Sequence, residues 1–185
     1  MPFVMTLDET DPSPALETAG FRGSGDSPWW DEGSMLPKLP SYVIFVQRAL
    51  RSVNDLPENT VAAPIWSARL RKAIEGAGPV EFESVPVVIH DKPEPTKVRE
   101  DFSLVHVLTE VRDAIDPAGT DASTFSFGPQ WKSVRGFRLR RSPPQAAWRL
   151  FELPTHVMVS DAAAAAIRAA GVRGVALVAP EEFKL

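Results

Sequence analysis

The chain has 185 residues, of which 44% are hydrophobic, and a net charge of −4. This length suits one compact domain with a substantial core, and the absence of cysteine excludes disulfides, thiolate metal sites and cysteine nucleophiles. The first residues, MPFVMTLDET, lack the basic and apolar regions of a signal peptide, and no apolar run reaches the roughly 18 residues of a membrane span, so we expect a cytoplasmic protein without membrane contact.

The charge is distributed unevenly along the chain. Residues 1–40 contain seven acids and two bases, a net charge of −5, which leaves +1 for the other 145 residues. No acid occurs between Asp121 and Glu152, whereas six bases do: Lys132, Arg135, Arg138, Arg140, Arg141 and Arg149. Such asymmetry can mark an interaction surface; the more common explanations are a solvated strand face or an acidic tail that folds back onto the basic stretch.

Residues 8–40 are rich in Pro, Gly, Ser and acids, so we expect regular structure there to be short or absent. The character of the sequence changes at Ser41, where an apolar run begins. We therefore predict an irregular acidic arm over residues 1–40 and a single domain over residues 41–185.

Two adjacent tryptophans lie in this predicted arm. Trp29 and Trp30 are followed directly by Asp31 and Glu32. Because tryptophan in a polar surround is a frequent interface anchor, these four residues are the predicted partner-binding residues. The alternative is that the arm lies on the domain and buries one or both rings.

The first elements of the domain follow from residue type and capping signals. The β-branched and aromatic run from Tyr42 to Val46 predicts a buried strand. Ser67, the segment ARLRKAIEGA and Gly78 follow in the order of a serine N-cap, a helix and a glycine just beyond its end. The run from Val80 to Ile89 predicts the next strand.

The strongest periodicity occurs in residues 101–115 and predicts a core-facing helix. Its apolar residues recur at intervals of three and four: Leu104, Val107, Leu108, Val111, Ala114 and Ile115. On the opposite face of that helix, His106, Glu110 and Asp113 would lie together and could share a metal or a proton. A solvated polar face is the favoured interpretation.

The C-terminal part of the chain predicts several strands and one more helix. Phe137 and Leu139 alternate with arginines as in a half-buried strand, and the apolar runs over residues 148–153 and 157–159 predict further strands. Ser160 caps a helix that Gly171 ends, and residues 174–178 form a last strand. These elements indicate the α+β class, a mixed β-sheet covered by a few helices.

One internal similarity has an offset of 93 residues. Ile65-Trp-Ser67 and the helix after it match Met158-Val-Ser160 and its helix, so each unit has the order strand, serine cap, helix, glycine. Convergence on good capping and a true duplication explain this similarity equally well.

No motif in the sequence indicates catalysis. The chain contains no G-x-S-x-G elbow, no H-E-x-x-H helix and no Walker lysine loop, and His90 and His156 have no recognisable partner. The bases of residues 132–149, with aromatic residues nearby, could bind nucleic acid, but the isoelectric point of about 5.4 argues against it. We predict no catalytic residue, no metal, no cofactor and no nucleic-acid partner.

The C-terminal two thirds of the chain resembles the bacterial polymorphic-toxin immunity proteins typified by a Myxococcus immunity domain. The resemblance spans roughly residues 64–178 and rests on three blocks in order. These are Trp66 to Gly78 with Val80 to Phe82, Phe102 to Leu108 with Ala114 to Asp116, and Leu150 to Leu153 with Val157 to Ser160 and Ala169 to Val175. The family usually carries Asn near the position of His106, so the chain departs from the pattern there.

The resemblance implies a non-catalytic protein that binds and neutralises a cognate toxin or secreted effector encoded by the adjacent gene. It transfers no catalytic residue, and it leaves residues 1–63 for partner-specific contacts. The alternative function is a regulatory or chaperone-like inhibitor that keeps a secreted enzyme inactive before export.

Overall fold

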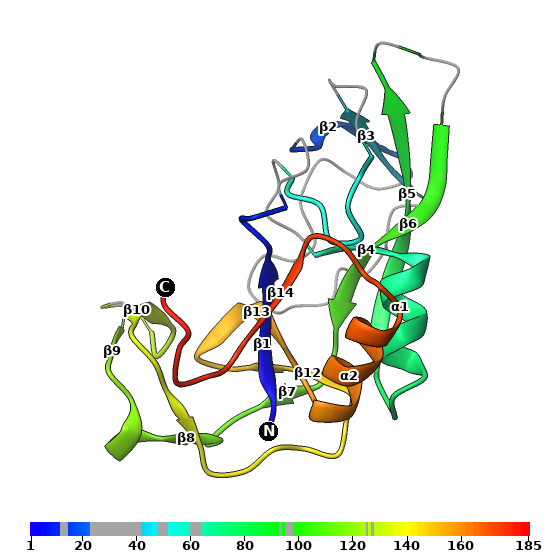
Figure 1. Cartoon of the computed structure of the whole chain (residues 1–185). Helices are drawn as coiled ribbons and strands as arrows, with labels where there is room; N and C mark the ends of the chain where they lie inside the picture. The colour runs from blue at the N-terminus through cyan, green and yellow to red at the C-terminus, as the bar shows by residue number, and fades with distance from the viewer. Residues whose placement is uncertain are drawn as a thin grey trace.

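The computed structural model describes residues 1–11, 15–22, 42–47, 52–59, 64–92, 94, 98–124, 126 and 128–185. This part of the chain forms two five-stranded sheets, two small two-stranded sheets and two α-helices (Figure 1). The first sheet has the spatial order β14 (Val175–Val178), β1 (Phe3–Leu7), β13 (Leu153–Val159), β12 (Ala147–Leu150) and β7 (Glu110–Val111). The second has the order β2 (Glu17–Arg22), β3 (Tyr42–Gln47), β5 (Phe82–Asp91), β6 (Val98–Val107) and β4 (Ile65–Ser67).

Both large sheets mix strand directions. β12 runs parallel to β7 and β3 runs parallel to β5, while the other pairs are antiparallel. The small sheets pair β8 (Ile115–Asp116) with β11 (Arg138–Leu139) and β9 (Ala122–Thr124) with β10 (Trp131–Val134), and a short 3-10 helix, η2 (Pro117–Gly119), follows β8. The α+β class with mixed sheets and few helices is confirmed.

The buried apolar side chains of the described residues form three hydrophobic cores. A shared core contains residues of both sheets and both helices, among them Met5, Trp66, Leu70, Val105, Val157 and Ile167. The second-sheet core lies on the other face of that sheet and includes Phe45, Val87, Phe102 and Leu104. The first-sheet core includes Val4, Trp148, Met158 and Phe137. Each large sheet is therefore covered on both faces over part of its area.

The two helices begin as the sequence predicts. α1 (Ala68–Glu75) starts after Ser67, whose Oγ accepts a hydrogen bond from Leu70 N at 3.1 Å, and α2 (Asp161–Ala169) starts after Ser160, whose Oγ accepts from Ala163 N at 3.1 Å. Gly171 follows α2 with a φ of +61°, as predicted for the residue after a helix. α1 ends at Gly76 instead of Gly78, so it is shorter than predicted.

The two serine-capped units that resemble each other in sequence lie in different settings. β4 is at the edge of the second sheet, whereas β13 is inside the first sheet. Their helices α1 and α2 pack against each other, and both contribute to the shared core (Figure 1). The repeated pattern thus joins the two sheets through a pair of helices.

The prediction of a helix over residues 101–115 is wrong. Residues 101–107 are the last seven residues of β6, Glu110–Val111 is β7, and Ile115 begins β8. Phe102 and Leu104 point into the second-sheet core, and Val105 and Val107 point into the shared core on the opposite face. A strand that is buried on both faces places apolar residues at uneven intervals, and these intervals resemble a helical stripe.

This correction changes which leucine should matter for stability. Leu104 is 1% exposed, whereas Leu108 is half-buried beyond the end of β6. We expect Leu104→Ala to lower the free energy of unfolding by about 2–5 kcal/mol, and Leu108→Ala to lower it clearly less. Chemical denaturation of both variants checks this. Equal losses would argue for the helix instead of the strand.

The structure places two strands within residues 1–40, where we expected an irregular arm. β1 lies between β14 and β13, and β2 is the edge strand beside β3. The folded body therefore includes residues that precede Ser41. Residues 23–40 lie outside the described residues, so the expectation for them stays a prediction.

Candidate functional site

Three loops meet at one end of the first sheet. They are residues 8–11 after β1, residues 52–59 before β4, and residues 171–174 between α2 and β14. β1 and β14 are antiparallel, so the end of one strand lies beside the start of the other, and Asp8 N donates to Gly174 O at 3.2 Å. The middle loop joins them through Asp55 N, which donates to Arg173 O at 3.0 Å.

Asp55 is the centre of this junction. Its carboxylate is 10% exposed and accepts hydrogen bonds from the Ser67 hydroxyl and from Arg173 N, the latter at 2.8 Å. Arg69 Nε lies 3.7 Å from the same carboxylate. One buried acid therefore ties the N-cap of α1 to the loop before β14.

Arg173 and Asn54 connect the first loop to the other two. The Arg173 guanidinium donates to both carboxylate oxygens of Asp11, at 3.0 and 3.2 Å, and this hydrogen bonding raises the pKa of Arg173. Asn54 Nδ2 donates to Asp11 O. Gly174 has a φ of +71°, and a Cβ at this position would lie 2.5 Å from Asn54 Cβ, so glycine is required for this close approach.

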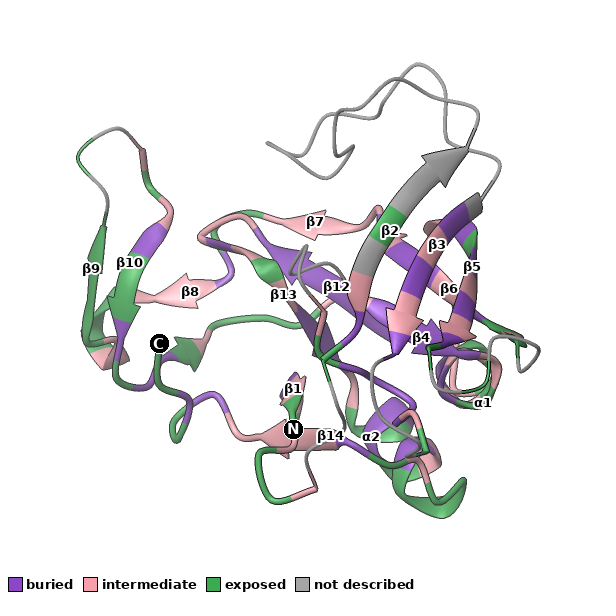
Figure 2. Cartoon of the chain, turned by 90° about the horizontal axis from the view of Figure 1, so that it is seen from above, coloured by how far each residue is buried: buried purple, intermediate pink, exposed green. Residues whose placement is uncertain are grey.

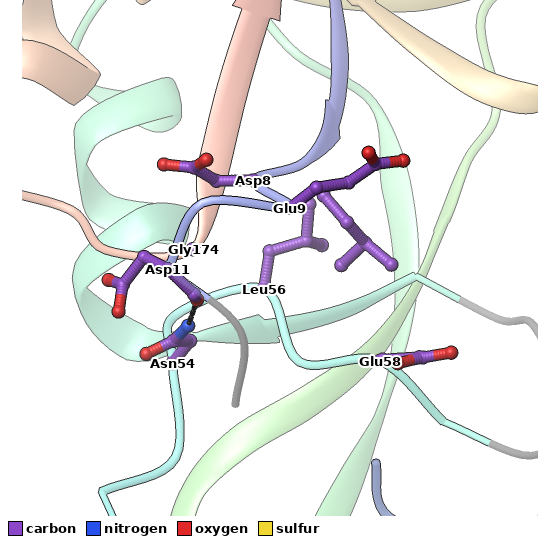
Figure 3. A pocket seen from close by; sticks show the side chains of 8 residues that line it. Asp8, Glu9, Asp11, Asn54, Leu56, Glu58 and Gly174 are labelled. Carbon is purple, nitrogen blue, oxygen red and sulfur yellow. Dashed lines mark hydrogen bonds between the residues drawn. The ribbon is translucent and has the colours of Figure 1, made fainter. Parts of the chain in front are cut away.

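The junction borders a pocket of about 340 Å³ that opens to solvent. Its lining consists of Leu7, Asp8, Glu9, Asp11, Asn54, Leu56, Glu58 and Gly174. Figure 3 shows Leu56 in the middle of this group with the four carboxylates around it. Leu56 is 8% exposed and belongs to the shared core, so the pocket is built on a fixed part of the fold.

The lining carries a strong negative charge. Asp8, Glu9, Asp11 and Glu58 are acids, and Arg173 neutralises Asp11 alone. Hydrogen bonds from the side chain and backbone of Thr10 hold the pKa of Asp8 below its ordinary value, so this carboxylate stays ionised at neutral pH. The side chains of Glu9 and Glu58 form no hydrogen bond or ion pair with another described residue, which leaves both carboxylates available to a cationic ligand.

The candidate site residues from the sequence do not come together in the described structure. Trp29, Trp30, Asp31 and Glu32 lie outside the described residues. His106, Glu110 and Asp113 share no helix, because His106 is on β6, Glu110 is on β7 and Asp113 is in a turn with a φ of +56°. The described ranges contain no group of three His, Asp or Glu side chains that could hold a metal.

The basic stretch does not form one uniform surface. Arg149 is 8% exposed, and its Nε donates to Val107 O at 2.6 Å. Lys132, Arg135, Arg138, Arg140 and Arg141 are exposed.

Burial lowers the pKa of His106, and the nearby positive charge of Arg149 lowers it further, so His106 is neutral at pH 7.

The sequence indicated that the N-terminal segment is acidic, but it did not indicate a pocket. The acidic N-terminal segment supplies Asp8, Glu9 and Asp11, whereas Asn54 and Glu58 come from a loop that has no motif. The Pro57 and Asn54-Asp55 positions are typical of a turn, but no sequence signal places that turn beside residues 8–11.

The comparison with known families covers most of the chain. The model of the Immunity protein family (Imm11) matches residues 12–181. The chain belongs to this family. The Imm11 match confirms the resemblance seen in the sequence and extends it toward the N-terminus, across β2, β3 and the loop that contains Asn54 and Glu58. The acids at positions 8, 9 and 11 precede the matched Imm11 region.

One other comparison and one property of the helices complete the description of this Imm11 member. No curated protein matches the chain. Neither of the two described helices has the length and apolar character that a bilayer span requires.

Proposed function

We propose that the chain binds and neutralises a cognate bacterial toxin or secreted effector by direct, non-catalytic contact, and that the acidic pocket is part of the contact surface. Membership of the immunity family supports the class of function. The observation that supports the site is the junction of three loops, where four carboxylates surround a pocket on a fixed base. The proposed location is the cytoplasm, and the proposed partner is encoded by the adjacent gene.

The pocket chemistry favours a basic partner surface. A single ion pair of an exposed carboxylate contributes little binding free energy. Several negative charges on one surface nevertheless speed the encounter with a positively charged partner. Glu9 and Glu58 come from two loops and are both exposed, so they can approach one lysine or arginine of a partner from different sides. The ion pair of Asp11 with Arg173 ties the loop that carries Glu9 to the loop before β14.

The charge of the pocket gives a direct test. We expect the double variant Glu9→Gln and Glu58→Gln to lower the association rate with the partner on the order of ten-fold at low salt and to reduce the salt dependence of that rate. Surface plasmon resonance against the neighbouring gene product measures both quantities. The matched control removes two exposed acids of β6, by Glu100→Gln and Asp101→Asn, and should change neither. Equal effects of both double variants would contradict the assignment.

The segment with the tryptophan pair remains the second proposed contact, through Trp29, Trp30, Asp31 and Glu32. Arg22 on β2 pairs with Tyr42 on β3, so residues 23–41 connect two strand ends that already lie side by side. An Asn-Gly turn can therefore replace those residues without disturbing the sheet.

We expect this loop replacement to preserve the melting temperature and to weaken partner binding. Trp30→Ala alone should cost about 2 kcal/mol or more of binding free energy if that ring is an interface anchor. Calorimetric titration, with melting curves of the same samples, separates binding from folding. Unchanged affinity of the replacement variant would move the contact entirely to the described surface.

A further inference from the structure

β14 is an edge strand, with no further described strand paired to its outer side. It ends the first sheet, and the four residues Val175–Val178 are all only half-buried, whereas Val4 and Met5 on the neighbouring β1 are buried. Figure 2 shows β14 beside β1, coloured as half-buried along the strand. The other edges of the large sheets are β7, β2 and β4.

The register shows which backbone groups face outward. Asp8 N donates to Gly174 O, and the pairs Thr6 with Ala176 and Val4 with Val178 follow at two-residue steps. In an antiparallel ladder hydrogen-bonded pairs alternate along the strand, so Ala176 and Val178 bond to β1. The N–H and C=O groups of Val175 and Leu177 therefore point away from the sheet, and no described residue bonds to them.

Natural proteins commonly protect such an edge with lysine, proline or a bulge, and β14 has none of these within its four residues. Acids lie at both of its ends. The pocket with Asp8 and Glu9 adjoins Gly174 at the start of the strand, and Glu181 and Glu182 are exposed shortly after its end. An apolar edge between two acidic ends matches an extended segment that carries basic residues.

We infer that an extended, basic segment of the toxin adds to the first sheet beside β14 and places a lysine or arginine in the acidic pocket. This inference rests on the proposed function. Backbone hydrogen bonds to Val175 and Leu177 supply the pairing, and the pocket supplies the preference for a cation. A second copy of this chain fits less well, because antiparallel pairing of two β14 strands would direct Glu181 and Glu182 of each copy toward the acidic pocket of the other.

The first test uses a synthetic peptide as the probe. We add Lys-Thr-Val-Thr-Val-Lys to the full chain and follow amide hydrogen exchange by NMR. The amides of Val175 and Leu177 should exchange at least about ten-fold more slowly with the peptide, while those of Ala176 and Val178 are slow throughout. The matched peptide Glu-Thr-Val-Thr-Val-Glu should have no such effect. Equal protection by both peptides, or by neither, would overturn the inference.

The free chain supplies the control for self-association. If the amides of Val175 and Leu177 become protected as the concentration of the chain alone rises, a second copy occupies the edge and the inference is wrong.

The second test uses the neighbouring gene product and two variants at one position. Leu177→Pro removes an outward N–H that the native sheet does not use, and Leu177→Ala removes the same side-chain packing but keeps the N–H. Binding should be at least about ten-fold weaker for the proline variant than for the alanine variant. Melting curves of both show whether each folds.

The outcomes separate the two proposals. A gene product that binds both variants equally overturns the edge assignment and leaves the proposed function intact. A gene product that does not bind the chain at all, together with protection by the lysine peptide, overturns the proposed function and leaves the edge site standing.

Discussion

A chain that lacks residues 1–40 is expected not to fold. This truncation removes β1 from between β14 and β13, and it takes Val4 and Met5, which are 0% and 5% exposed, out of two different cores. It also removes Leu16, which is fully buried in the second-sheet core. Each large buried side chain that is lost lowers the free energy of unfolding by about 2–5 kcal/mol. The summed loss exceeds the roughly 5–15 kcal/mol by which folded domains are stable.

Far-UV circular dichroism and NMR dispersion of the truncated chain measure this result. The matched control is the variant in which an Asn-Gly turn replaces residues 23–41, because it lacks three of the seven acids of the same segment but keeps β1 and β2. A cooperative melting curve for the truncated chain would show that residues 1–40 are an independent arm after all.

Asp55→Ala is expected to be the most destabilising change of a single polar residue at the site. It leaves Arg173 N and the Ser67 hydroxyl without their shared acceptor in a buried place. Each hydrogen bond to a charged group contributes roughly 1.5–3 kcal/mol, so we expect a loss of about 3–6 kcal/mol in the free energy of unfolding. Urea denaturation at pH 7 measures it.

Two further variants make this result specific to the junction. Asp55→Asn keeps one acceptor oxygen and should lose less than Asp55→Ala. Asp101→Ala removes an exposed acid of β6 and should change stability by less than about 0.5 kcal/mol. Similar losses for Asp55→Ala and Asp101→Ala would mean that the hydrogen bonds of Asp55 add little.

Local signals predicted those parts of the fold that depend on neighbouring residues. Both serine caps were predictable, because the Oγ of Ser67 and of Ser160 bonds to an amide only three residues away. The strands β3, β5 and β14 were predictable from runs of β-branched residues. The ends of these strands in the structure differ from the predicted ends by only a few residues.

The segment over residues 101–115 failed because burial there is decided by distant partners. Leu104 pairs with Ile65 and Val85, and Val105 lies on the face that α1 covers. With both faces buried, the two-residue alternation that identifies a strand disappears. The periodicity that remained was accidental, and it suggested a helix.

The candidate site could be predicted only in part, for a related reason. Three of its acids follow from the uneven charge of the chain, but the pocket exists because Asp55 and Arg173 bring together loops that are more than 40 residues apart in sequence. No local rule relates Glu58 to Glu9. The tryptophan pair was predictable as an anomaly of composition, and its role stays a proposal.

The position of β1 also has a consequence for the timing of synthesis. Val4 pairs with Val178 and with Met158, so β1 leaves the ribosome more than 140 residues before either of its partner strands is made. Chains grow at roughly 5–20 residues per second, and such non-local pairing is slow to form once the partners exist. If the chain neutralises a toxin as proposed, a cell that makes both at the same moment has an unprotected interval. Protection would then depend on a stock of molecules that finished folding before the toxin was made.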